Sequence, residues 1–152
     1  MITAGHACRT KLETVICEAM GKRGLPHEHR SLKFRVRDAD GNEASYTPAI
    51  VARRGPILFL VEPVRSGRGR GATISFSRFL EQHSPEIVFV VVTMDSMVNR
   101  FPKEAYDEIY GESAIRTLIT RIRNQDPKGI VQPFEKPRPA TGASKADVTP
   151  AD

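Results

Sequence analysis

Two stretches decide how this chain folds: YTPAIV at residues 46–51 and ILFLVEPV at residues 57–64. Both are apolar and rich in β-branched residues, which is typical of strands that pack into a core. The segment RRGP at residues 53–56 lies between them and has the composition of a tight turn. The pattern predicts strands over about 45–52 and 57–62, and the second strand ends on a carboxylate, Glu62. That carboxylate needs a partner, water or a metal ion, because burying an unpaired charge is costly.

Length and composition bound what this chain can be. Its 152 residues allow one domain with a proper core, which we place at residues 1–134. The Pro-, Ala-, Thr- and Lys-rich segment 135–152 is predicted to be a disordered tail. No apolar run approaches the ~20 residues that a membrane span needs. Two cysteines, Cys8 and Cys17, are too few for a disulfide framework, so we expect a reduced, cytoplasmic setting.

The remaining periodicities predict a mixed α/β fold. Thr10 and Glu13 have the spacing of a capping box at the start of an amphipathic helix over about 10–22. Residues 32–37 alternate between apolar and basic side chains, as a half-buried strand does. Other elements are expected as follows: a helix over 73–83, a buried strand over 87–92 that runs parallel to strand 57–62, a helix from Pro102 through Ile109, a further helix to about 124, and a short terminal segment over 130–134. The order helix, three strands, helix, strand, helices favours one central sheet covered by helices.

This α-β-β-β-α-β order, with additional C-terminal helices, resembles the PD-(D/E)XK nuclease superfamily, which has the restriction-endonuclease-like fold. The resemblance covers roughly residues 10–93. In that family a Pro-Asp pair opens the second strand and Glu-X-Lys closes the third. The Asp and Glu hold Mg²⁺, the Lys positions or activates the attacking water, and a helix Glu often completes the site. On this chain the resemblance implies Glu62 and Glu13 as the catalytic carboxylates, with Glu62 as a metal ligand.

Two positions depart from the family pattern. The metal-binding Asp position is Ala49, and the lysine position is Val64. Mg²⁺ needs carboxylate oxygens, so losing one of two close carboxylates weakens its binding. Valine can neither orient a water molecule nor stabilise a phosphate in the transition state. Ala49 is either natural or an introduced Asp→Ala change, and the second explanation leaves Val64 unexplained.

Basic residues supply the prediction of a partner. The net charge of +5 and the pI of about 9.5 favour a polyanion. The arginines expected to contact phosphates are Arg53, Arg54, Arg65, Arg68 and Arg70. The basic face of strand 32–37 (Lys33, Arg35 and Arg37) either lines a nucleic-acid groove or solvates an edge strand.

The sequence therefore supports several hypotheses. The first is a nuclease-related nucleic-acid-binding protein, with DNA as the expected partner, that has an impaired metal site and little or no cleavage. The alternatives are an active Mg²⁺-dependent endonuclease with a rebuilt site, and a protein–protein interaction module that keeps only the fold. A homodimer is compatible with all three. His27-Glu28-His29 is a weak metal pattern without further ligands nearby in sequence, and Cys17 is interpreted as a buried structural thiol.

Overall fold

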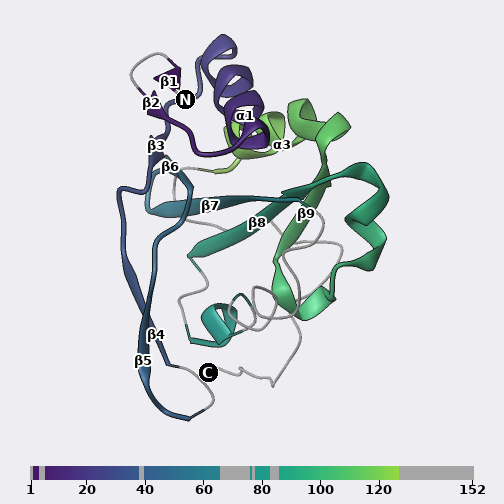
Figure 1. The fold of residues 1–152 in the computed structure, drawn as a ribbon. Helices are drawn as coiled ribbons and strands as arrows, with labels where there is room; N and C mark the ends of the chain where they lie inside the picture. Colours follow the sequence, from purple (N-terminus) through teal and green to yellow (C-terminus); the bar gives the residue numbers. More distant parts are fainter. Residues whose placement is uncertain are drawn as a thin grey trace.

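The computed structural model describes residues 2–3, 6–37, 40–65, 76, 78–82 and 86–126, and its centre is a five-stranded sheet (Figure 1). The strand order is β3-β6-β7-β8-β9. These strands are β3 (Glu28–His29), β6 (Ile50–Arg54), β7 (Ile57–Val64), β8 (Ile87–Thr93) and β9 (Glu108–Gly111). β6 is antiparallel to both β3 and β7, whereas β8 is parallel to both β7 and β9. The predicted parallel pairing of the third and fourth strands is confirmed.

The β6–β7 hairpin confirms the predicted tight turn. Gly55 has a φ of 59°, which favours glycine, and it lets Arg54 pair directly with Ile57. The strand predicted over 45–52 is wrong, because the structure divides it into β5 (Glu43–Tyr46) and β6. Pro48 lies in the break between these strands and has no N–H to donate to a ladder. β7 continues to Val64, so Glu62 lies within the strand rather than at its end.

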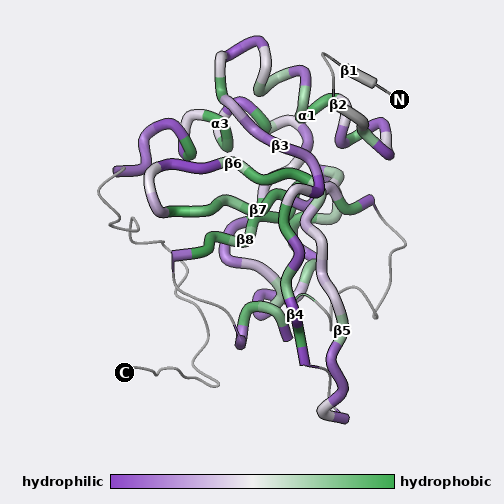
Figure 2. Tube along the Cα trace, turned by 90° about the vertical axis from the view of Figure 1, so that its left-hand side faces the viewer, coloured by the Kyte–Doolittle hydropathy of each residue, from purple (hydrophilic) through white to green (hydrophobic). Residues whose placement is uncertain are grey.

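β5 belongs to a separate two-stranded ribbon with β4 (Phe34–Arg37). Phe34 pairs with Tyr46 at the base of this ribbon, and Arg37 pairs with Glu43 toward its tip. Val36 is buried while Arg35 and Arg37 are exposed, so the predicted alternation is confirmed. The ribbon extends away from the central sheet (Figure 1), and hydrophilic residues gather toward its tip (Figure 2).

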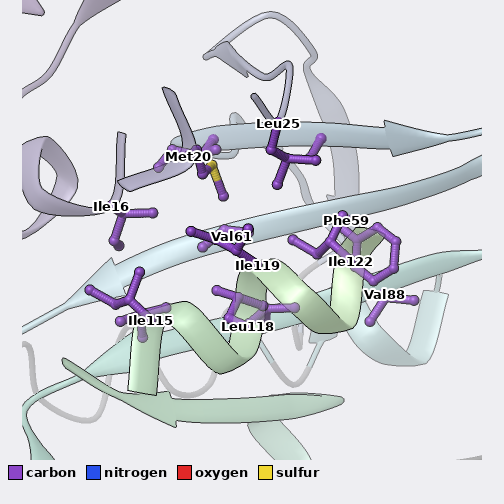
Figure 3. Packing of buried hydrophobic residues seen from close by; sticks show 14 of the residues in the cluster. Ile16, Met20, Leu25, Phe59, Val61, Val88, Ile115, Leu118, Ile119 and Ile122 are labelled. Carbon is purple, nitrogen blue, oxygen red and sulfur yellow. The ribbon is translucent and has the colours of Figure 1, made fainter. Parts of the chain in front are cut away.

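Helices α1 (Lys11–Lys22) and α3 (Ile115–Arg123) cover one face of the sheet (Figure 3). They form the first core cluster with alternate residues of the strands. Its members include Leu12, Ile16, Met20, Phe59, Val61, Val88, Leu118, Ile119 and Ile122. Both helices confirm the 3.6-residue periodicity in the sequence, since most residues of each apolar stripe are buried. Val15 of α1 is the exception, because it is 46% exposed.

The second core cluster lies on the opposite face of the sheet. It combines strand residues such as Leu60, Val64 and Phe89 with Val36 of the ribbon and with a helical segment. Residues 76 and 78–82 of the helix predicted over 73–83 are described, and they are helical. Four aromatic rings pack together here: Tyr46, Phe76, Phe79 and Phe89. The chain therefore has a mixed α/β architecture with two cores separated by one sheet.

The helix predicted from Pro102 through Ile109 is wrong. The structure has 3₁₀ turns at Asp95–Arg100 and Lys103–Ala105, followed by β9. Asp107 explains the extended backbone: its N–H donates to the Phe89 carbonyl, and its carboxylate accepts from the Phe89 N–H, both at 2.9 Å. These bonds attach the chain to β8 and bring Ile109 beside Val91.

Two short elements at the start of the chain were not predicted. These strands, β1 (Ile2–Thr3) and β2 (His6–Ala7), pair antiparallel with each other. The predicted segment 130–134 and the predicted tail 135–152 lie outside the described residues. Among the helices in the described ranges, none combines the length and apolar character that crossing a membrane requires.

Candidate functional site

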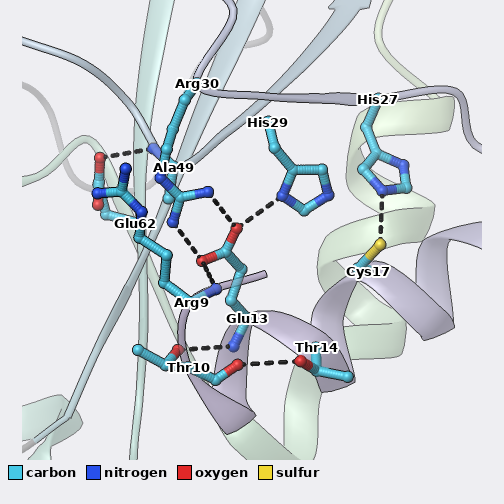
Figure 4. A network of polar contacts seen from close by, with 10 residues as sticks. All are labelled: Arg9, Thr10, Glu13, Thr14, Cys17, His27, His29, Arg30, Ala49 and Glu62. Atoms are coloured by element: carbon cyan, nitrogen blue, oxygen red, sulfur yellow. Dashed lines mark hydrogen bonds and ion pairs between the residues drawn. The ribbon is translucent and has the colours of Figure 1, made fainter. Parts of the chain in front are cut away.

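Glu62 is a buried carboxylate, and its donors include a tyrosine hydroxyl and a backbone N–H. Its side chain shares the second-cluster face of β7 with Leu60 and Val64, because strand residues alternate between faces. The Ala49 N–H donates to Glu62 Oε2 at 3.1 Å (Figure 4), and the Tyr46 hydroxyl donates to the same oxygen. The carboxylate that the sequence singled out is thus satisfied within the fold by its neighbours.

Glu13 is a second buried carboxylate, only 1% exposed, and it is held by a guanidinium, an imidazole and a backbone N–H. The Arg30 guanidinium donates to both of its oxygens, at 2.9 and 2.6 Å, and His29 Nδ1 lies 2.6 Å from Oε2 (Figure 4). Burial alone would raise the pKa of Glu13, but the bonds from Arg30, His29 and the Arg9 N–H outweigh it and hold the pKa below its usual value. Glu13 is therefore an ionised partner of Arg30.

The start of α1 positions this carboxylate. Thr10 Oγ1 accepts from the Glu13 N–H at 3.1 Å, which is the N-cap bond that the sequence predicted. The reciprocal bond of a capping box goes instead to the preceding residue, because Glu13 Oε1 accepts from the Arg9 N–H at 3.1 Å. The helix cap and the ion pair therefore fix the same side chain.

Arg30 reaches Glu13 from an uncommon backbone conformation. Its φ is 52°, in the left-handed region that residues with a side chain rarely occupy. The Arg30 N–H donates to the Ala49 carbonyl at 3.1 Å, which ties this turn to the start of β6. Non-glycine residues persist in this region where the surroundings hold them there, and here a bidentate ion pair and a backbone bond do so.

The two predicted catalytic carboxylates lie on opposite faces of the sheet. Glu13 belongs to α1, which packs on the first-cluster face, whereas Glu62 projects from the other face. At the family's Asp position, Ala49 offers no side-chain oxygen, and Val64 is a buried apolar residue of the second cluster. Mg²⁺ requires several oxygen ligands in near-octahedral geometry. The residues at these positions therefore do not fit the Mg²⁺ ion that the resemblance implies.

The predicted phosphate-binding arginines do not form one surface. Arg53 and Arg54 are the last residues of β6, directly before the hairpin turn, and the Arg54 guanidinium donates to the Arg123 carbonyl at 3.0 Å. Arg65 follows the far end of β7, and the eight residues of that strand span about 26 Å at ~3.3 Å per residue. Arg68 and Arg70 lie outside the described residues.

The basic face of the ribbon is connected to Glu62 through Tyr46. Lys33 and Arg35 flank Phe34, which pairs with Tyr46, the donor to Glu62. Lys33, Arg35 and Arg37 are all exposed. The ribbon geometry is compatible with both interpretations of this strand, a nucleic-acid-binding face and a solvated edge.

A cluster of cysteine and histidine side chains was missed by sequence reasoning. Ligand atoms of Cys8, Cys17 and His29 all lie within 4.8 Å of one another, and Nε2 of His27 lies 3.2 Å from Cys17 Sγ. The interpretation of Cys17 as a buried thiol is confirmed. The two histidines have no further ligands near them in sequence, and the fold brings the cysteines to them. The four residues are separated by eight, nine and one intervening positions (C-x8-C-x9-H-x-H), so their meeting depends on how α1 packs against β3.

The electrostatics of Cys17 indicate the kind of chemistry that this cluster supports. Burial, together with the neighbouring Cys8, raises the pKa of Cys17 to about 12. A thiol with such a pKa is a poor nucleophile near neutral pH, because the thiolate is the reactive form. Cys17 is therefore not an activated nucleophile near neutral pH.

Comparisons with protein families, curated protein sequences and solved structures found no match for this chain.

Proposed function

We propose that this protein is a nuclease-related nucleic-acid-binding protein, with DNA as its expected partner, and that it has little or no cleavage activity. One observation carries the proposal: the Ala49 N–H binds Glu62 at the place where the family has a second carboxylate. This contact brings positions 49 and 62 together, as the resemblance requires, while the oxygen ligand that Mg²⁺ would need there is replaced by a hydrogen-bond donor.

The ion pair on the other face supports the same proposal. Glu13 binds Arg30 through both oxygens, and recruiting it to a metal would require breaking a bidentate, charge-assisted interaction in a buried environment. The Arg30 guanidinium thus occupies the position beside Glu13 that a metal ion would need. In this arrangement Glu13 is paired with Arg30 and Glu62 accepts hydrogen bonds, so neither expected carboxylate is available for metal-dependent cleavage.

The exposed basic residues support binding. Lys33, Arg35 and Arg37 alternate along the outer face of the β4–β5 ribbon. A two-stranded ribbon fits the major groove of B-DNA, and its basic side chains can also contact phosphates. We therefore assign the main contact surface to the ribbon, with Arg53, Arg54 and Arg65 as further phosphate contacts.

The test combines retention and cleavage in one experiment. Labelled linear, branched and single-stranded DNA is incubated with the protein in Mg²⁺, in Mn²⁺ and in chelator, over a series of salt concentrations. We expect retention without cleavage, with an affinity that falls steeply as salt rises. The variant Arg35→Ala should lower the slope of log affinity against log salt by about one phosphate contact. Arg116→Ala, on the exposed side of α3, removes the same charge elsewhere and is the matched control.

Two results would overturn the proposal. Metal-dependent cleavage that Glu62→Ala abolishes would show an active endonuclease with a rebuilt site. No retention of any DNA at low salt would favour a protein–protein interaction module, and the oligomeric state measured in the same buffer would then show whether the partner is a second copy.

A further inference from the structure

We propose that Cys8, Cys17, His27 and His29 bind a structural zinc ion. This site is independent of the proposed nucleic-acid-binding function. Cys8 and Cys17 are each 3% exposed, and His29 Nε2 is also a buried atom. Two cysteine sulfurs and two histidine nitrogens are the donor set that favours zinc in tetrahedral geometry over Mg²⁺ or Ca²⁺, which prefer oxygen.

The hydrogen bonds of the two imidazoles identify which nitrogens face the metal. His27 Nδ1 lies 3.0 Å from the Leu25 carbonyl, and His29 Nδ1 lies 2.6 Å from Glu13 Oε2. A carbonyl and an ionised carboxylate can only accept, so each Nδ1 carries the proton. In a neutral imidazole this leaves the Nε2 lone pair for a ligand, and metal-binding histidines commonly donate their other N–H to a carboxylate or carbonyl in this way.

The separations between the ligand atoms can be compared with those of a tetrahedral zinc site. Zn–S bonds of about 2.3 Å and Zn–N bonds of about 2.0–2.1 Å place tetrahedral ligand atoms roughly 3.3–3.8 Å apart. Nε2 of His27 and Sγ of Cys17 are 3.2 Å apart, and the ligand atoms of Cys8, Cys17 and His29 lie within 4.8 Å of one another. The two imidazole rings meet edge to face, with centroids 5.2 Å apart. Zinc binding therefore requires side-chain movements that bring Cys8, Cys17 and His29 from separations of up to 4.8 Å to tetrahedral distances, with His27 as the fourth ligand.

The charge of the bound site suits its burial. Each cysteine loses its thiol proton to solvent as its sulfur binds, so Zn²⁺ with two thiolates and two neutral imidazoles has no net charge. A neutral centre avoids the cost of burying a charge. All four coordination positions are filled by protein, which is the arrangement of structural rather than catalytic zinc sites.

The position of the ligands says what the ion does for the fold. Cys8 precedes α1, Cys17 lies within α1, and the two histidines lie in the segment that leads into the edge strand β3 and in β3 itself. One ion therefore links the N-terminal segment, the helix and the sheet edge. Figure 4 shows Cys17 and both histidines beside the Glu13 network, so zinc binding and the Arg30–Glu13 pair stabilise the same corner of the molecule.

The test uses the full chain, purified under reducing conditions. Titration with zinc against a chromophoric chelator should give one zinc per chain. Cobalt in place of zinc should give the visible bands of a tetrahedral ion and the near-ultraviolet thiolate-to-metal band. Cys17→Ser or Cys8→Ser should halve that thiolate band and greatly weaken zinc binding, while His27→Gln should keep the band and weaken the affinity. Val15→Ser, on the exposed side of α1, is the control and should change neither result.

One measurement needs no variant and so remains decisive if a variant fails to fold. X-ray absorption at the zinc edge of the wild-type protein should give two sulfur and two nitrogen ligands at about 2.3 and 2.0–2.1 Å. The proposal is overturned if the reduced, folded protein takes up no zinc, or if the thiolate band is absent. It is also overturned if the native protein carries a Cys8–Cys17 disulfide, seen as a mass lower by two hydrogens.

Discussion

Glu13 and Glu62 are both buried carboxylates, yet the fold holds them in opposite ways. Glu13 is bound by the guanidinium of Arg30 and the imidazole of His29, whereas Glu62 accepts from the Tyr46 hydroxyl and the Ala49 N–H. Removing a cation from a buried carboxylate leaves an uncompensated charge, while removing a neutral donor costs one hydrogen bond. Burial alone therefore does not predict how much stability each carboxylate loses when a partner is removed. The nature of the partner decides that loss.

The largest effect on stability should come from Arg30→Met, which removes the guanidinium that pairs with Glu13. Glu13 is 1% exposed, so the loss of its partner should destabilise the protein by about 3 kcal/mol, toward the lower end of the values for buried pairs. Urea unfolding followed by circular dichroism, in the presence of chelator, measures the change. A loss below about 1 kcal/mol would contradict the assignment of Glu13 as an ionised partner of Arg30.

Arg35→Met is the matched control for that variant. It breaks the Arg35–Glu43 pair, in which the side chains are 82% and 56% exposed and the charges are 3.6 Å apart. Exposed pairs contribute roughly 0–1 kcal/mol, because water and salt screen them. The same unfolding experiment should show nearly wild-type stability, and the difference between the two arginine variants isolates the effect of burial.

Tyr46→Phe tests the hydrogen bond from the Tyr46 hydroxyl to Glu62. It removes the hydroxyl that donates to Glu62 and should cost about 1–3 kcal/mol, because a buried acceptor loses a partner. Thermal unfolding of Tyr46→Phe, Glu62→Gln and the double variant gives the coupling energy between the two side chains. Additive effects of the two substitutions would show that the contact contributes nothing to stability.

Thr10→Ala should have the smallest effect of the variants that weaken a described buried contact. It removes the N-cap acceptor of the Glu13 N–H at 3.1 Å and should cost about 1 kcal/mol. Thr10→Ser keeps an oxygen at the same position and should retain most of the stability. If alanine and serine at this position give equal unfolding midpoints, the cap does not hold α1 in place.

The fold was predictable where a single hydrophobic periodicity continued through the whole element. α1, α3 and β8 follow continuous patterns, and the structure confirms all three. The pattern failed where a single residue overrode it. Pro48 interrupts the strand predicted over 45–52, and the two bonds between Asp107 and Phe89 turn a predicted helix into β9. The second failure depends on a contact between segments far apart in sequence, which no local window contains.

The site was predictable in part for a similar reason. The need of Glu62 for a partner follows from its place in an apolar strand, but the identity of that partner depends on the ribbon that carries Tyr46. The capping role of Thr10 is local and was predicted. The meeting of Cys8 and Cys17 with two histidines depends on tertiary packing, and the only local signal was the His27-Glu28-His29 triplet.

The position of β8 between two parallel neighbours has a consequence for how the chain folds. β6 and β7 meet through a two-residue turn, but Leu58 must find Ile87, and Val90 must find Glu108. Closing loops of this length costs chain entropy before any pairing compensates for it, so sheets with such distant pairings form slowly. We expect pulsed hydrogen exchange during refolding to protect the β6–β7 hairpin first and β8 last, although β8 is the most deeply buried strand of the finished sheet.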